Sequence, residues 1–113
     1  MHELGIVIHV VQTVEEFATQ NGLTKIDTLV IQIGELSGCV PRYFEACYPA
    51  AVDGTLLQET KLIIEILPSN ALCNKCSTVF NLIENDYKCP NCGEKDCEIL
   101  CGKEFVIKEI IAC

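Results

Sequence analysis

Four cysteines occur as two pairs whose spacing suits a metal ion. The pairs are Cys73-Asn-Lys-Cys76 and Cys89-Pro-Asn-Cys92, with 12 residues between them. Two residues between thiolates let the chain turn tightly, so both sulfurs can reach one ion, and a second such turn completes a tetrahedral site. We therefore predict a structural zinc held by these four cysteines. Because sulfur would fill all four positions, water or substrate could not bind the zinc, and zinc catalysis is not expected.

The amino terminus Met1-His2-Glu3 is a second concentration of possible metal ligands. The terminal amine, the amide and imidazole nitrogens of His2 and the Glu3 carboxylate lie within three residues. An amine, a deprotonated amide and an imidazole can form fused chelate rings in one plane, which suits nickel(II) or copper(II) better than zinc. The spacing by itself is more typical of a solvent-exposed terminus without a metal. His9 lies two helical turns further on, and we expect it to be a surface or packing residue.

The cysteines are also compatible with a different metal and with roles outside a metal site. Iron in a rubredoxin-like site is the rival metal, although Cys76-Ser77 lacks the glycine that follows Cys92. Cys97 and Cys101 follow the second pair closely and could be spare ligands or redox-active thiols. The simplest role for the remaining cysteines is packing or surface exposure, and this applies to Cys39, Cys47, Cys97, Cys101 and Cys113.

Composition excludes several classes of protein. Sixteen acidic residues against eight basic ones give the 113-residue chain a net charge of -8, which repels phosphate backbones and argues against nucleic acid as a partner. The apolar runs are short and interrupted by charge, so no transmembrane helix is predicted. The first residues lack the basic region of a secretory signal, and the paired cysteine spacing favours reduced thiols. We expect a cytoplasmic protein.

The elements that must position these groups can be read from the apolar pattern. Apolar residues at three- and four-residue steps, beginning with Leu4, Val7, Val11, Val14 and Ala18, predict an amphipathic helix over residues 4–20. Pro41 can open a second helix through Tyr48, which Pro49 should bend or shorten. Segments rich in β-branched residues predict strands at residues 26–33, 62–67 and 105–111.

The order of these elements predicts an α+β fold. The last strand follows the cysteine segment, so we interpret that segment as a module inserted between two strands of one sheet. The expected architecture is a three-stranded sheet with two helices, formed by residues 1–68 and 104–113, and a four-cysteine zinc ribbon formed by residues 69–103. The ribbon has too few apolar residues for an independent core, so metal binding should supply much of its folding free energy.

Several motifs together resemble the HypA/HybF family of hydrogenase nickel-incorporation proteins. They are Met1-His2-Glu3-Leu4, Gly34-Glu35-Leu36-Ser37 after the first strand, the two cysteine pairs, and a closing strand after Gly102. The resemblance extends over the whole chain. One departure is Gly5, where the family commonly has serine, and it could loosen the first helical turn.

The resemblance implies a nickel metallochaperone and not an enzyme. It implies that His2 binds the transported nickel, with the Met1 amine or Glu3 as further candidates, and that Cys73, Cys76, Cys89 and Cys92 bind zinc. The implied partners are the large subunit of nickel-iron hydrogenase, a maturation GTPase and, in some organisms, the urease maturation proteins. The alternative from the zinc pattern alone is a zinc-ribbon adaptor or transcription-related protein, against which the acidic charge argues.

Overall fold

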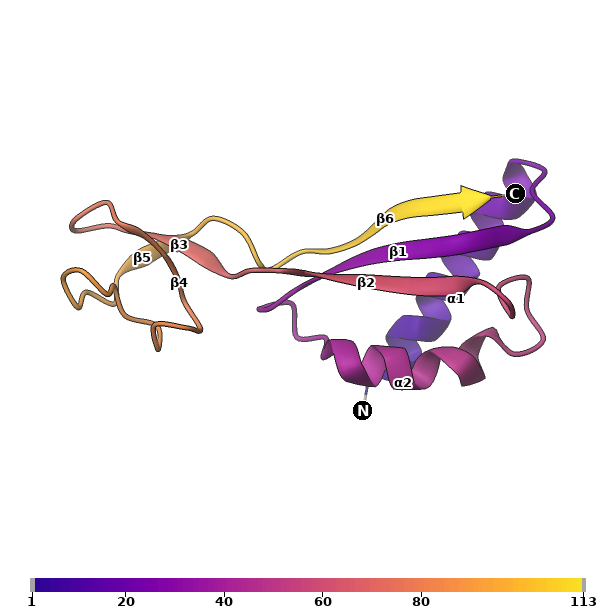
Figure 1. Cartoon of the computed structure of the whole chain (residues 1–113), viewed down its shortest axis with the longest axis horizontal. Helices are drawn as coiled ribbons and strands as arrows, with labels where there is room; N and C mark the ends of the chain where they lie inside the picture. Colours follow the sequence, from indigo (N-terminus) through magenta and orange to yellow (C-terminus); the bar gives the residue numbers. More distant parts are fainter. Residues whose placement is uncertain (1, 113) are drawn as a thin grey trace.

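The computed structural model describes residues 2–112 and shows an elongated molecule of 54 × 27 × 16 Å (Figure 1). Helices and a first sheet form one end, and a small second sheet with long loops forms the other. Met1 and Cys113, which were considered as a nickel ligand and a surface thiol, lie outside the described residues. In chain order the elements are α1 (Glu3–Gln20), β1 (Ile26–Gly34), α2 (Pro41–Val52), β2 (Lys61–Leu67), β3 (Asn70–Cys73), β4 (Val79–Asn81), β5 (Cys97–Ile99) and β6 (Phe105–Ala112).

The first sheet confirms the predicted α+β architecture. Its strand order is β2-β1-β6, with β1 parallel to β2 and antiparallel to β6. The crossover between the parallel strands contains α2, as such a connection requires. Because β6 returns to this sheet after the cysteine segment, the segment is an insertion between β2 and β6, as predicted.

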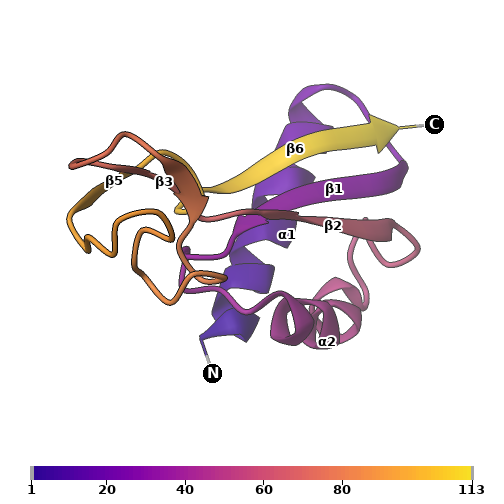
Figure 2. The same cartoon turned by 60° about the vertical axis from the view of Figure 1, so that its left-hand side comes forward.

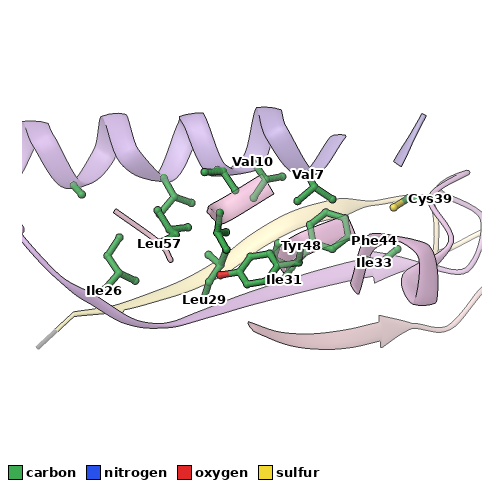
Figure 3. Close-up of a cluster of buried hydrophobic side chains, with 14 residues drawn as sticks. Val7, Val10, Ile26, Leu29, Ile31, Ile33, Cys39, Phe44, Tyr48 and Leu57 are labelled. Carbon is green, nitrogen blue, oxygen red and sulfur yellow. The ribbon is translucent and has the colours of Figure 1, made fainter. Parts of the chain in front are cut away.

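One core lies between the two helices and one face of this sheet (Figure 3). Val7 and Val10 of α1 face Leu29 and Ile31 of β1, and the Phe44 ring of α2 is fully buried among them. Alternate residues of a strand point to opposite faces, which is why Leu29 and Ile31 both reach the helices.

The helix predictions need two corrections at residue level. Leu4 was placed in the apolar stripe of α1, yet it is 44% exposed, because the buried stripe is narrower than the apolar pattern suggested. The second helix is not shortened at Pro49 but continues to Val52. A proline inside a helix removes one hydrogen bond, and burial of Tyr48 and Val52 against the core offsets that loss.

The cysteine segment forms a second sheet of strand order β4-β3-β5. Its strands have three or four residues each, too few for a periodic pattern to reveal, and none of them was predicted. Behind them lies a small core of Ala71, Phe80, Leu82 and the buried cysteines Cys73 and Cys89. The two sheets thus have separate cores at opposite ends of the molecule (Figure 2).

Two glycines allow three chain segments to cross where the sheets meet. The Gly34 N–H donates to the Glu104 carbonyl at 2.8 Å, and the Leu36 N–H donates to the Gly102 carbonyl at 2.7 Å. A Cβ atom on Gly34 would overlap the Gly102 carbonyl, and one on Gly102 would lie 2.6 Å from the Ser69 Cα atom. Only glycine fits at these positions, so the crossing fixes how the second sheet leaves the first.

Replacing Gly34 with alanine should therefore destabilise the protein by about 1–3 kcal/mol, because the backbone of Gly102 must move. Gly5→Ala is the matched control: Gly5 is exposed in α1 and a Cβ there meets nothing within 4 Å. This second change should stabilise the protein by about 0.5–1 kcal/mol through helix propensity. Chemical denaturation followed by circular dichroism measures both, and equal effects of the two changes would contradict the clash.

Candidate metal sites

The four predicted zinc ligands converge in the second sheet. The Sγ atoms of Cys73, Cys76, Cys89 and Cys92 all lie within 4.8 Å of one another. Two of the separations, Cys73 to Cys92 and Cys76 to Cys89, are 3.5 Å. Four sulfurs about 2.3 Å from one zinc ion would stand roughly 3.8 Å apart at the corners of a tetrahedron. The arrangement therefore fits zinc with little adjustment.

The two cysteine pairs form turns of the same geometry. In the first turn the Cys73 N–H donates to the Thr78 carbonyl at 2.9 Å, and the Ser77 N–H donates to the Cys73 carbonyl at 3.0 Å. In the second turn the Cys89 N–H donates to the Glu94 backbone carbonyl at 2.9 Å, and the Gly93 N–H donates to the Cys89 carbonyl at 2.8 Å.

Ser77 has φ of 63° and Gly93 has φ of 78°, so serine adopts the left-handed conformation that glycine provides in the other turn. The absence of a glycine after Cys76 therefore does not change the site, and it no longer separates zinc from iron.

Local hydrogen bonds favour the thiolate form of Cys76, whereas the pKa of Cys92 is raised to about 12. The Thr78 hydroxyl, 3.1 Å from the Cys76 sulfur, is the largest cause that lowers the pKa of Cys76 to about 5. The Lys75 N–H also donates to the Cys73 sulfur at 3.4 Å. A backbone or hydroxyl donor stabilises a negative sulfur, as does a metal ion.

His2 is the N-cap of α1, and the N-terminus lies beside α2, away from β3, β4 and β5 (Figure 1). Its side chain is 71% exposed, and its Nε2 atom lies 3.3 Å from the Gly38 carbonyl oxygen. A carbonyl only accepts, so Nε2 must carry the proton in this contact, which leaves Nδ1 of the neutral ring with a free lone pair. His9 is exposed on α1, as expected of a surface residue.

Glu3 joins the start of α1 to the entry of α2. The residue is 3% exposed, and its carboxylate accepts a hydrogen bond from the Val40 N–H at 3.3 Å, just before α2 begins at Pro41. The same carboxylate oxygen lies 3.9 Å from His2 Nε2. The burial of Glu3 could not be predicted from the sequence, because the contact joins residues 37 positions apart.

Glu35 joins the two sheets and was missed as a functional residue. One carboxylate oxygen accepts from the Ser69 N–H at 2.8 Å, from the Ser69 hydroxyl at 2.9 Å and from the Asn81 side-chain amide at 3.3 Å. The Ser69 N–H, followed by the Ser69 hydroxyl and Asn81, lowers the pKa of Glu35 below that of an ordinary glutamate. The only signal in the sequence was the Gly34-Glu35-Leu36-Ser37 motif, which does not reveal its partners.

The other described cysteines have different surroundings. Cys39 is buried in the helix-sheet core, where burial raises the pKa of its thiol, and Cys47 is partly buried on α2. The Cys101 sulfur lies 3.4 Å from the Pro68 carbonyl, near the crossing. Cys97 stands opposite Cys73 in the β3–β5 pair.

Comparison with known proteins agrees with this arrangement. Residues 1–112 match the family model described as hydrogenase/urease nickel incorporation, metallochaperone, hypA. The chain belongs to the HypA family. It is 36% identical over 110 residues to the hydrogenase maturation factor HypA of Geobacter sulfurreducens and 34% identical over 110 residues to that of Chlorobium limicola. The alignments cover 97% of this chain in both cases, and 97% and 95% of the two relatives.

Solved HypA structures have a similar fold. The solution structure of the nickel metallochaperone HypA from Helicobacter pylori is 28% identical, with a TM-score of 0.67 over 99% of this chain and 97% of that one. A second HypA solution structure has a TM-score of 0.70 at 27% identity, over 100% of this chain and 97% of the other. The family descriptions name metallochaperones and maturation factors, which confirms that the chain is not an enzyme.

Residues 2–112 contain no helix long and apolar enough to span a membrane.

Replacing Glu35 with glutamine should weaken the junction between the sheets at neutral pH, because the charge on the shared acceptor is lost. Since folding lowers the pKa of Glu35, its stabilisation is complete above the pKa of an unfolded glutamate, about 4.3, and declines as pH falls through the lower folded-state pKa.

The difference in free energy of unfolding between the two proteins should therefore be largest near pH 7 and shrink below about pH 4. Any loss of zinc at low pH would affect the wild type and the variant alike, so it cancels in the difference between their free energies of unfolding. Glu98→Gln, which removes an exposed carboxylate of β5, is the control. A difference that does not change with pH would show that the charge of Glu35 is unimportant.

Proposed function

We propose that this HypA-family chain is a nickel metallochaperone that binds nickel(II) at its amino terminus through His2. The observation that carries the proposal is the contact between Nε2 of His2 and the Gly38 carbonyl. It holds the proton on Nε2 and turns the lone pair of Nδ1 outward from that contact, in the way that metal-binding histidines are commonly oriented.

The backbone at His2 is suited to the same task. The first hydrogen bond of α1 runs from the Ile6 N–H to the His2 carbonyl, at 3.1 Å. The amide nitrogen of His2 therefore precedes the helical ladder, where N–H groups have no intrahelical acceptor. Its deprotonation by nickel would break no helical hydrogen bond. Nδ1 and this amide can then form the planar nitrogen set that nickel(II) accepts.

The position of the site favours release as well as capture. An exposed side chain can exchange its metal directly with an acceptor docked against it. The positive end of the α1 dipole mildly opposes a cation, which weakens binding. Protonation of His2 competes with nickel, so affinity should fall as pH decreases. These features suit transport better than permanent storage.

The four cysteines would hold zinc as part of the fold. On this proposal, residues 1–68 and 104–113 form the nickel-binding domain, and residues 69–103 form a zinc module. The crossing at Gly34 and Gly102 holds the module in a fixed direction. When bound, zinc supplies the link between the two cysteine turns, because Ala71, Phe80 and Leu82 alone form a very small core.

The acceptor we propose is the large subunit of nickel-iron hydrogenase, with a maturation GTPase as a second partner. The matched relatives are named hydrogenase maturation factors, and the family description includes urease as well as hydrogenase. We therefore include urease maturation proteins among the proposed partners. Assembly of such enzymes would place the chain in the cytoplasm, consistent with reduced cysteines.

Replacing His2 with alanine should reduce nickel binding at least tenfold, because the imidazole ligand is lost while the fold is untouched. His9→Ala, which removes the other histidine from the same helix, should bind nickel normally. Isothermal titration with nickel(II), together with zinc analysis of both variants, makes the measurement. Stoichiometric nickel binding of unchanged affinity in the His2 variant would refute the proposed site.

Replacing Cys89 with serine should release zinc and unfold the module while the helix-sheet domain remains folded, because only the small core depends on the ion. Amide signals of residues 69–103 should collapse in a two-dimensional NMR spectrum, and those of α1 and β1 should persist. Cys47→Ser, outside the module, should retain zinc. Native mass spectrometry identifies the ion, and iron in its place would contradict the zinc assignment.

A further inference from the structure

Cys97 is a fifth cysteine beside the four proposed zinc ligands. It pairs with Cys73 across the antiparallel strands β3 and β5, and it packs against the small core of the module. Partners in register point to the same face of a sheet, so the Cys97 side chain lies on the face where Cys73 meets the other ligands.

The hydrogen-bond pattern shows which kind of cross-strand pair this is. The Asn74 N–H donates to the Asp96 carbonyl at 3.1 Å, one residue beyond each cysteine. Cys73 and Cys97 therefore occupy a non-hydrogen-bonded position, where the Cα atoms of the two strands are typically about 4.5 Å apart. Disulfides span Cα separations from about 4.4 to 6.8 Å, so the pair can be linked without moving the strands apart.

We propose that Cys97 and Cys73 are a redox pair: a peroxide oxidises them to a disulfide, and this removes one zinc ligand. The inference rests on the zinc part of the proposed function and not on nickel binding. Cys97 is partly exposed, whereas Cys73 is only 1% exposed. Of these two thiols the oxidant therefore reaches Cys97 more readily, and Cys73 acts as the resolving thiolate.

The chemistry balances in two steps. The Cys97 thiolate attacks one peroxide oxygen, breaks the O–O bond and becomes a sulfenic acid, with hydroxide as the leaving group. The Cys73 thiolate then leaves zinc and attacks the Cys97 sulfur, forming the S–S bond and expelling a second hydroxide. The two sulfurs lose two electrons and the peroxide gains them; the proton from the Cys97 thiol converts one hydroxide to water.

Loss of Cys73 leaves zinc with Cys76, Cys89 and Cys92. If zinc is bound, these three cysteines would hold it less firmly than all four together. Zinc should therefore dissociate as the disulfide forms. Since the disulfide joins β3 to β5, it would retain the strand pair while releasing the cysteine turns that zinc held together.

Cys101 provides a matched control within the same module. It has the same intermediate exposure as Cys97, but its sulfur lies against the Pro68 carbonyl at the crossing, and it follows the end of β5 at Ile99. Oxidation of cysteines in general would affect both residues, whereas the proposed pairing requires Cys97 alone.

The test uses the full zinc-loaded chain. Hydrogen peroxide is added in equimolar amount, zinc release is followed with a chromogenic chelator, and disulfides are mapped after alkylation and digestion. Cleavage after Lys75, Lys88 and Lys95 places Cys73, Cys76 and Cys97 in separate peptides, and cleavage after Glu98 separates Cys97 from Cys101.

The expected product is a peptide pair joined by Cys73 and Cys97, formed at the rate of zinc release. Cys97→Ser should slow this release at least tenfold, and Cys101→Ser should leave it unchanged. A disulfide between Cys89 and Cys92 in place of the expected one, or equal rates in the wild type and the Cys97 variant, would overturn the proposal.

Two further measurements distinguish a failure of the zinc assignment from a failure of the redox pair. Zinc content before oxidation tests the site itself: a chain that purifies without zinc refutes the zinc assignment, while the disulfide map still decides whether Cys97 and Cys73 pair. If Cys97→Ser does not retain zinc, the map of the wild-type protein decides, because it needs no variant.

Discussion

The crossing of three chain segments at the end of β1 is the constraint on which the rest of the structure depends. Gly34 and Gly102 bring backbone within a distance that no Cβ atom would permit, and Glu35 then bonds to Ser69 from the same turn. Without the close approach the carboxylate could not reach both Ser69 and Asn81. The position of the second sheet relative to the first is thus set largely by residues outside the two proposed metal sites.

A second long-range contact positions the start of α1. Ends of chains are poorly ordered unless something holds them, and here the buried Glu3 carboxylate binds the Val40 N–H at the entry to α2. His2 is thereby placed near Gly38 while its side chain stays exposed. The arrangement combines a defined backbone position with the access that metal transfer requires.

The two proposed metal sites have opposite physical designs. The cysteine site is closed by four sulfurs on a partly buried sheet, which suits retention of an ion. The terminal site has an exposed imidazole at the positive end of a helix, which suits exchange. Retention at the cysteine site would also depend on Cys97, because oxidation of this fifth thiol could link it to Cys73 and remove one zinc ligand.

The sequence by itself determined the cluster of four cysteines and the main elements. Cysteine pairs encode a four-sulfur site because ligand spacing is local, and apolar periodicity encodes α1 and the three strands of the first sheet because burial repeats along the chain. The short strands of the module escaped prediction since three or four residues carry no period.

Tertiary structure alone decided the burial of Glu3, the continuation of α2 past Pro49, the partners of Glu35 and the pairing of Cys97 with Cys73. Each of these depends on residues distant in sequence, whose approach is fixed only when the helices, the two sheets and the glycine crossing have packed together.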